Sequence, residues 1–179
     1  ETLPSHVGQD LVLTIDRRVK YITERVLSEA IGQYQAKSGT IIVMNPQTGA
    51  ILAMVSLPAY DPNQFGASNP EVLADPAISK QYEPGSVFKI ITMAAGIDAG
   101  IITPDTVLTD TLSIEVGDRQ IFNSVKRSYG PVTIRQALVL SLNIPTAKVA
   151  LELEEARFYQ YVQRFGFGRL TEVDLANEG

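Results

Sequence analysis

The segment YEPGSVFKIITMAAGIDAG spans residues 82–100 and is the most informative part of the chain. A Pro-Gly pair precedes Ser86 and is typical of a turn, and the residues that follow are almost all apolar or small. A run that is apolar on every side predicts a buried helix, here over residues 86–99, and Gly100 stands where its end is expected. Ser86 would therefore lie in the first turn of a buried helix, with Lys89 one turn later on the same face.

This placement favours a nucleophilic serine. The N–H groups of a first helical turn have no helical partner and the helix dipole is positive there, so negative charge developing on Ser86 would be stabilised. Its own backbone N–H could also face an oxyanion. A lysine among apolar side chains loses hydration, which lowers its pKa, and a neutral Lys89 could then act as the general base for Ser86. The alternative is a helix-capping serine followed by a lysine that reaches solvent, and these residues alone leave both interpretations open.

The composition limits the kinds of protein this chain can be. It has 179 residues, 45% of them hydrophobic and 20% charged, which is ordinary for a globular domain. The net charge of −5 argues against nucleic acid as a partner. The sequence contains no cysteine, which excludes disulfides, thiolate nucleophiles and cysteine-based metal sites. His6 is its single histidine, so we expect no histidine-rich metal centre, no Ser-His-Asp triad and no cofactor.

The first third of the chain predicts a strand, an amphipathic helix and a β-hairpin. Residues 10–15 alternate in polarity as a strand does. A helix is expected from an N-cap at Asp16 to about Gln35, with one buried stripe. We assign to this stripe Val19, Ile22, Val26, Ala30 and Ile31. Residues 38–45 and 50–56 are apolar segments on either side of a Pro-Gln-Thr-Gly turn, which predicts a hairpin.

The rest of the chain predicts irregular structure, short strands and helices. Residues 57–75 are punctuated by Pro, Asn and Gly, and residues 106–126 indicate a small β excursion. We interpret the acids of this part as a solvated face and not as a catalytic carboxylate pair; they are Asp105, Asp110, Glu115 and Asp118. Thr133 is a good N-cap for a helix. The helices expected from there on span residues 134–140, 145–154 and 154–165.

Ser141 and Asn143 lie in the break between two of these helices. A hydroxyl and an amide there are free to project into a cleft, although the pair alone also fits helix capping. With Ser86 and Lys89 they form a longer pattern, in which S-x-x-K is followed 55 residues later by S-x-N.

This combination resembles the transpeptidase domain of penicillin-binding proteins, which shares its fold with serine β-lactamases and uses S-x-x-K, S-x-N and K-T-G motifs. Three longer segments carry the resemblance and are similar to class B members of the family. They are GTIIVMNPQTGAILAMVSLPAYDPN (39–63), QALVLSLNIPTAKVA (136–150) and FGFGRLTEVDL (165–175). The resemblance implies an α+β fold, with a β-hairpin near the N-terminus followed by a helical subdomain. It also implies that residues 1–179 are the N-terminal part of a single transpeptidase domain.

The resemblance also implies a role for each motif residue. Ser86 would attack the carbonyl of the penultimate D-Ala of a peptidoglycan stem peptide and form an acyl-enzyme. Lys89 would take its proton, Ser141 would relay a proton to the leaving nitrogen, and Asn143 would bind the substrate amide and help orient Lys89. The amine of a second stem peptide would release the acyl group as a cross-link, and a β-lactam, which mimics D-Ala-D-Ala, would leave an ester on Ser86. A β-lactam sensor, which acylates and signals, is the alternative function.

The sequence contains no K-T-G, the motif that in this family walls the cleft and supplies a second oxyanion N–H. We therefore expect an N-terminal part whose later strands are missing and which acylates slowly. The apolar edge of hairpin 39–56 is expected to cause self-association. The family further implies a glycosyltransferase partner and a location on the extracytoplasmic face of the bacterial cytoplasmic membrane, with an anchoring helix N-terminal to this chain.

Overall fold

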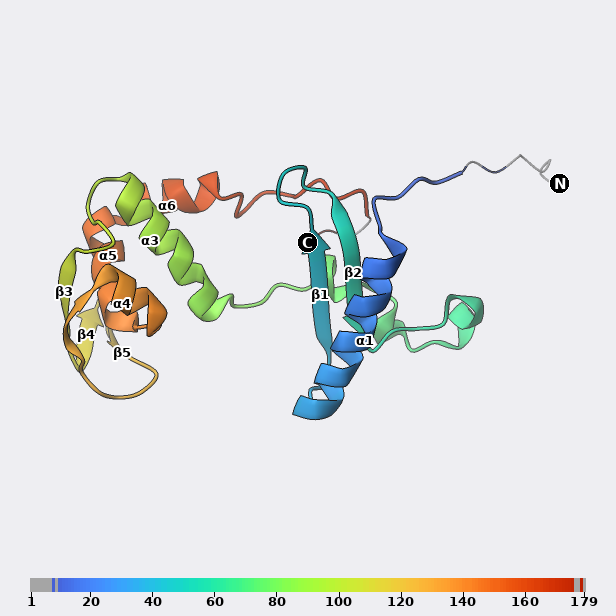
Figure 1. Ribbon diagram of the computed structural model, residues 1–179, viewed down its shortest axis with the longest axis horizontal. Helices are drawn as coiled ribbons and strands as arrows, with labels where there is room; N and C mark the ends of the chain where they lie inside the picture. The colour runs from blue at the N-terminus through green and yellow to red at the C-terminus, as the bar shows by residue number, and fades with distance from the viewer. Residues whose placement is uncertain (1–7, 9, 176–177, 179) are drawn as a thin grey trace. The chain divides into compact units, whose positions relative to one another are not determined.

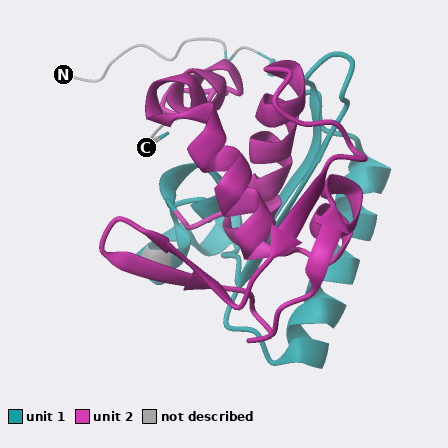
Figure 2. Cartoon of the chain, turned by 90° about the vertical axis from the view of Figure 1, so that its left-hand side faces the viewer, with its two compact units in different colours: residues 1–81, 175–179 teal, residues 82–174 magenta. Residues whose placement is uncertain are grey.

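The computed structural model describes residues 8, 10–175 and 178, so His6 lies outside the described residues. Figures 1 and 2 show two compact units. Unit 1 comprises Glu1–Gln81 with Leu175–Gly179, and unit 2 comprises Tyr82–Asp174. Both units contain helices together with antiparallel strand pairs, which confirms the predicted α+β class. That residues 1–179 belong to a single transpeptidase domain stays a prediction.

In unit 1, helix α1 (Arg17–Tyr34) packs on a hairpin of β1 (Gly39–Met44) and β2 (Ile51–Leu57) (Figure 1). Asp16 caps α1 as predicted, because its carboxylate accepts from the N–H groups of Arg18 (2.8 Å) and Val19 (2.9 Å). The two strands are antiparallel along their length, which confirms the predicted hairpin.

One prediction for unit 1 is wrong and another is right only in part. Residues 10–15 form no strand. One backbone bond, from Asp16 N–H to Leu52 O (2.9 Å), and one side-chain bond, from the Thr14 hydroxyl to Ile51 O (2.6 Å), hold this segment beside β2. The stripe predicted on α1 is right in part. Val19, Ala30 and Ile31 are half-buried as assigned. Ile22 and Val26 are exposed, and Thr23 and Leu27 are buried instead. Thr23 can be buried because its hydroxyl donates to the Val19 carbonyl (2.8 Å), which satisfies its polar group.

Short helical turns follow the hairpin, within the stretch predicted to be irregular (57–75) and directly after it. They are η1 (Pro62–Ala67), η2 (Pro70–Val72) and α2 (Pro76–Ser79). Helix α2 was not predicted, and it packs against both strands of the hairpin. Asp75 caps α2 by accepting from the N–H of Ala77 (2.9 Å) and also accepts from the Ser56 hydroxyl of β2 (2.7 Å). The loop is thereby tied to the hairpin.

Unit 2 starts with the 3-10 turn η3 (Gly85–Phe88), which continues into α3 (Lys89–Asp98). Gly100, with φ of 72°, follows the helix end as predicted. The prediction that this helix is buried on every side is wrong, because Ile90 and Ile97 are exposed. Burial is confined to one side, which packs mainly on α5.

Four short strands lie between α3 and α4. They are β3 (Val107–Asp110), β4 (Ser113–Val116), β5 (Arg119–Phe122) and β6 (Gly130–Thr133). The pairs β3–β6 and β4–β5 confirm the predicted β excursion, although β6 was not predicted. One of the acids assigned to a solvated face contradicts that prediction: Asp110 is fully buried, and Asp105, Glu115 and Asp118 are exposed.

The last three helices are α4 (Ile134–Val139), α5 (Asn143–Leu153) and α6 (Glu155–Arg164). Thr133 caps α4 as predicted, in a reciprocal capping box with Gln136. Helix α5 starts two residues earlier than expected, because Pro145 fits within the first turn, where its missing N–H has no helical partner to lose. The predicted break therefore narrows to Ser141 and Leu142, and Asn143 becomes the first residue of α5.

The core of unit 2 forms where α3 and α5 meet (magenta in Figure 2). Its buried residues are Met93, Ala95, Ile102, Val132, Ile134, Ala137, Leu142, Val149 and Leu153. Gly96 allows the close approach, because a Cβ there would lie 2.7 Å from Val149 Cγ1. This packing places Lys89 of α3 beside the turn that precedes α5. No helix within the described ranges is both long and apolar enough to cross a membrane.

Candidate active site

Ser86 lies on the turn η3 directly before α3, and its side chain is exposed. Gly85 precedes it with φ of 60°, a left-handed conformation that favours glycine. Phe88 anchors the same turn, since its ring meets those of Phe158 and Phe167 edge to face, with centroids 6.4 Å and 5.2 Å away. An exposed hydroxyl is thus presented on a turn that is fixed by aromatic packing.

Lys89 is the first residue of α3 and is 8% exposed. Its Nζ donates to the carbonyl oxygen of Ser141 (2.6 Å) and to Ser141 Oγ (3.0 Å). Among the described residues these are its side-chain hydrogen bonds, and none joins it to Ser86. Burial lowers the pKa of Lys89 below its ordinary value, because loss of hydration disfavours the charged amine. Lys89 is therefore easier to deprotonate than an exposed lysine, as a general base requires.

Ser141 stands in the sharp turn between α4 and α5. Its φ is 53°, a left-handed conformation that is uncommon for a residue with a side chain. The turn is closed by bonds to the end of α4, from Ser141 N–H to Leu138 O (3.0 Å) and from Leu142 N–H to Ala137 O (2.8 Å). The carbonyl and hydroxyl oxygens of Ser141 both accept from Lys89, so the turn directs two oxygens of one residue at one amine.

Asn143 is held by the segment that follows β5. Its side-chain Nδ2 donates to the Phe122 carbonyl (2.7 Å), and its backbone N–H donates to Asn123 Oδ1 (2.8 Å). The structure thus brings Lys89 and Ser141 into direct contact, while the hydrogen bonds of Asn143 go to β5 and the residue after it. Ser86 lies one turn before Lys89, and its backbone carbonyl accepts from the Lys89 N–H. Among the described residues, no hydrogen bond joins the Ser86 hydroxyl to the Lys89 amine or to Ser141.

Two buried polar residues support this region, of which Asn123 was not predicted and Asp110 was assigned to a solvated face. Asn123 is 4% exposed and its Nδ2 donates to both carboxylate oxygens of Asp110, at 2.9 and 3.0 Å. A signal for the burial of Asp110 was present, because along β3 it falls on the same side as the half-buried Leu108 and opposite the exposed Val107 and Thr109. No local pattern around Asn123 indicates its partner.

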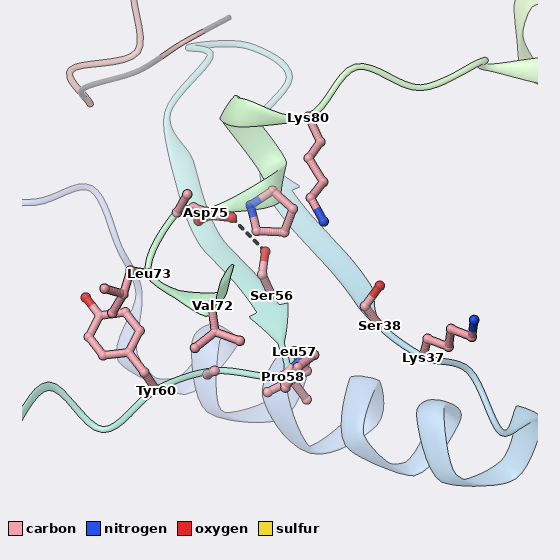
Figure 3. Close-up of a pocket in the computed structure, with 13 residues that line it drawn as sticks. Lys37, Ser38, Ser56, Leu57, Pro58, Tyr60, Val72, Leu73, Asp75 and Lys80 are labelled. Carbon is pink, nitrogen blue, oxygen red and sulfur yellow. Dashed lines mark hydrogen bonds between the residues drawn. The ribbon is translucent and has the colours of Figure 1, made fainter. Parts of the chain in front are cut away.

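A separate cavity of about 410 Å³ lies in unit 1, and none of the four predicted site residues lines it (Figure 3). Its walls come from the end of the hairpin and the loop before α2. The dashed line in Figure 3 joins Ser56 and Asp75, whose polar atoms hold α2 on the hairpin. Two exposed lysines, Lys37 and Lys80, stand at its rim. Ser56 and Asp75 are therefore already used by the fold.

Comparison with known proteins gives a consistent result. Residues 39–179 match the family described as "Penicillin binding protein transpeptidase domain". The chain is 33% identical over 161 residues to the "Probable peptidoglycan D,D-transpeptidase PenA" of Neisseria flavescens, covering 90% of this chain and 40% of that protein. It is 33% identical over 172 residues to the penicillin-binding protein PbpB of Mycolicibacterium smegmatis, covering 96% of this chain and 26% of the relative. The chain thus spans less than half the length of these relatives.

Solved structures give the same family assignment. Penicillin-binding protein 3 from Mycobacterium tuberculosis superposes with a TM-score of 0.89 at 30% identity, over 93% of this chain and 38% of that one. The D,D-transpeptidase domain of a peptidoglycan glycosyltransferase from Eggerthella lenta gives a TM-score of 0.82 at 32% identity, over 94% of this chain and 41% of the other. With the match over residues 39–179, these similarities show that the chain belongs to the penicillin-binding protein transpeptidase family and is a class B member.

Proposed function

We propose that the protein is a serine D,D-transpeptidase that cross-links peptidoglycan stem peptides through an acyl-enzyme on Ser86. The observation that carries this proposal is the buried Lys89 amine, which is held by Ser141 one turn after an exposed serine. The family membership and the names of the relatives, which include peptidoglycan D,D-transpeptidases, support the same chemistry.

In the proposed acylation, Ser86 Oγ attacks the carbonyl carbon of the penultimate D-Ala of a stem peptide. Neutral Lys89 accepts the hydroxyl proton as the C–O bond forms. The peptide C–N bond then breaks, and the leaving amine of the terminal D-Ala receives a proton that passes through Ser141, whose hydroxyl contacts Lys89. The products are an ester on Ser86 and free D-Ala, and Lys89 is neutral again.

In the second half of the reaction, the amine of another stem peptide attacks the ester carbonyl. Lys89 and Ser141 move its proton to Ser86 Oγ as the ester C–O bond breaks, so the serine is regenerated and a new peptide bond joins the two strands. A β-lactam follows the first half only. Its ring C–N bond opens, but the leaving nitrogen stays attached to the acyl group, which remains on Ser86.

Negative charge on the carbonyl oxygen needs hydrogen-bond donors, and the backbone N–H of Ser86 before α3 is the donor we assign to it. A second donor in this family comes from the K-T-G strand, and no K-T-G occurs in these 179 residues. Losing one oxyanion donor costs about 10²–10³ in rate, so we expect slow acylation from this chain alone.

The test is the intact mass of the protein after incubation with a penicillin. We expect a mass increase equal to one whole penicillin molecule, because ring opening loses no atoms. Ser86→Ala should abolish the adduct, and Ser124→Ala, at an exposed serine in the same unit, should retain it. An adduct that survives in Ser86→Ala, or no adduct on a chain that continues through a K-T-G motif, would contradict the proposal.

We propose two further properties of the protein. The exposed outer residues of β1, Ile42 and Met44, support self-association through hairpin 39–56.

Because the proposed substrate is peptidoglycan, we place the protein on the extracytoplasmic side of the cytoplasmic membrane, in the company of a glycosyltransferase that makes the glycan strands. Digestion of the protein by protease added to intact spheroplasts is the expected result, and full protection would contradict this location.

A further inference from the structure

Helix α5 begins without a cap of its own. Its N-cap residue is Leu142, whose side chain has no hydrogen-bonding group. The first two N–H groups of the helix, those of Asn143 and Ile144, instead point at Asn123 Oδ1, at 2.8 and 3.4 Å. Asn123 lies 20 residues before Asn143 in the chain and is 4% exposed. A side chain from the end of β5 therefore supplies the cap of α5, at the place where the S-x-N motif enters the helix.

Asp110 determines which way the Asn123 amide faces. The Asp110 carboxylate is fully buried and accepts from Asn123 Nδ2 and from the Tyr129 N–H (2.8 Å). A carboxylate without a proton only accepts hydrogen bonds, so the amide must turn its NH₂ group toward Asp110. Its oxygen then faces the N–H groups of α5, which only donate. The opposite orientation would set oxygen against oxygen and NH₂ against N–H.

The anchored end of α5 is one residue away from the turn of Ser141. Asn143 is bound from both sides, since Asn123 accepts from its N–H and Phe122 accepts from its side chain. Ser141 keeps a left-handed φ of 53° between this anchor and the end of α4. Conformations of this kind persist where the surrounding structure holds them. The two oxygens that bind Lys89 are thus placed by contacts that lie outside the motif itself.

We propose that Asn123, oriented by Asp110, is a positioning residue that holds Ser141 against Lys89 and thereby sets the rate at which Ser86 is acylated. The claim that Asn123 sets the acylation rate rests on the proposed function. The claim that Asn123 holds Ser141 against Lys89 does not. Neither residue touches the reacting atoms; both act through the start of α5.

Four variants test this. Asn123→Ala removes the acceptor, and Asn123→Asp sets two carboxylates face to face in a buried site. The double variant Asp110→Asn with Asn123→Asp exchanges the two groups and can rebuild one of the two bonds between them. Asn at 110 donates to the carboxylate at 123 and accepts from Tyr129, while the carboxylate accepts from Asn143. Leu153→Ala is the control, because it removes a buried side chain at the far end of α5.

The first measurement needs no reaction. Amide hydrogen exchange reports the Asn143 N–H, and competitive labelling with an amine-reactive reagent, read by mass spectrometry, reports Lys89. We expect Asn123→Ala and Asn123→Asp to speed exchange at Asn143 about tenfold and to raise the labelling of Lys89. The exchanged pair should restore both values, and Leu153→Ala should leave both unchanged below its unfolding temperature. If Asn123→Ala does not fold, the comparison of Asn123→Asp with the exchanged pair tests whether residue 123 positions Ser141.

The second measurement is the rate of penicillin acylation. We expect Asn123→Ala to lower it about 10²-fold, the effect of a misplacement on the order of 1 Å, and the exchanged pair to recover most of it. A folded Asn123→Ala that keeps its Lys89 labelling, or an exchanged pair no better than Asn123→Asp, would overturn the inference. If the unchanged chain takes no penicillin, the rates are compared on a chain that continues through a K-T-G motif. Failure of that parent chain too would contradict the proposed function, while exchange and labelling still decide the geometry.

Discussion

Lys89 is a buried amine that makes no salt bridge with any described carboxylate. Its partners are the carbonyl and hydroxyl oxygens of Ser141, which accept two hydrogen bonds from the amine without supplying a full negative charge. Loss of hydration is therefore not offset by an opposite charge, and the pKa of Lys89 falls. Had a carboxylate replaced Ser141, the amine would stay protonated and could not take a proton from Ser86.

We predict that the rate of penicillin acylation rises with pH and levels off above the lowered pKa of Lys89. The rate increases with pH because the reactive form is the neutral amine of Lys89, and the fraction of neutral amine grows as pH rises through the pKa. Lys89→Met should lower the plateau by about 10²–10⁴ and remove the pH step. Lys80→Met, at an exposed lysine, is the matched control and should keep both. The measurement is stopped-flow acylation by a fluorescent penicillin; an unchanged pH profile in Lys89→Met would assign the base elsewhere.

At the scale of elements, the site depends on how closely α3 and α5 approach. Gly96 stands at their contact, and a Cβ there would lie 2.7 Å from Val149 Cγ1 and 2.9 Å from Ile102 Cδ1. Both neighbours are buried core residues that have little room to move. The glycine is thus needed for close packing, and its φ lies outside the left-handed range.

We predict that Gly96→Ala lowers the free energy of unfolding of unit 2 by about 1–3 kcal/mol, the usual cost of overpacking a core. The matched control is Gly32→Ala in α1, where nothing lies within 4 Å of the added Cβ. That substitution should stabilise unit 1 by about 0.5–1 kcal/mol, because alanine loses less conformational entropy in a helix than glycine. Urea denaturation measures both, and a Gly96→Ala chain as stable as the parent would show that α3 and α5 are less tightly packed than described.

At the scale of the whole molecule, the exposed apolar side chains of β1 affect whether the protein associates with other copies of itself. Along β1 the residues alternate, with Ile41 and Val43 half-buried and Ile42 and Met44 exposed. One face of the hairpin carries α1. The other is covered in part, because Ser56 on it binds Asp75 at the start of α2, and it still presents Ile42 and Met44 of β1 to solvent. An antiparallel pair with apolar side chains exposed on one strand favours association with another chain.

We predict concentration-dependent self-association that Ile42→Lys weakens. A lysine at this position would have to bring its charge into the contact, and it leaves the α1 face of the hairpin untouched. Ile22→Lys, at an exposed apolar residue of α1, is the control and should associate like the parent chain. Sedimentation or light scattering across a concentration series measures this. A monomer at all concentrations, or equal association of Ile42→Lys and the parent, would exclude the hairpin as the contact.

Much of the fold could be predicted from local patterns, because caps and turns depend on neighbouring residues. Asp16 and Thr133 cap α1 and α4 as predicted, and Gly100 follows the end of α3. The hairpin also followed from its β-branched strands and central turn. Buried faces were predicted less well: Ile22 has the right spacing on α1 and yet is exposed, since the contact line also depends on what the hairpin presents.

The sequence by itself determined that Ser86 and Lys89 share one helical turn and that Ser141 and Asn143 stand together at a helix start, because these relations span at most four residues. Only the tertiary structure decided that Lys89 binds Ser141 across 52 residues, that Asp110 is buried, and that Asn123 caps α5. Each of these three features depends on which segment, distant in the sequence, packs against the residue concerned. A buried polar group is stable only with a partner, and the identity of that partner is set by the packing of the chain and not by the residues next to it.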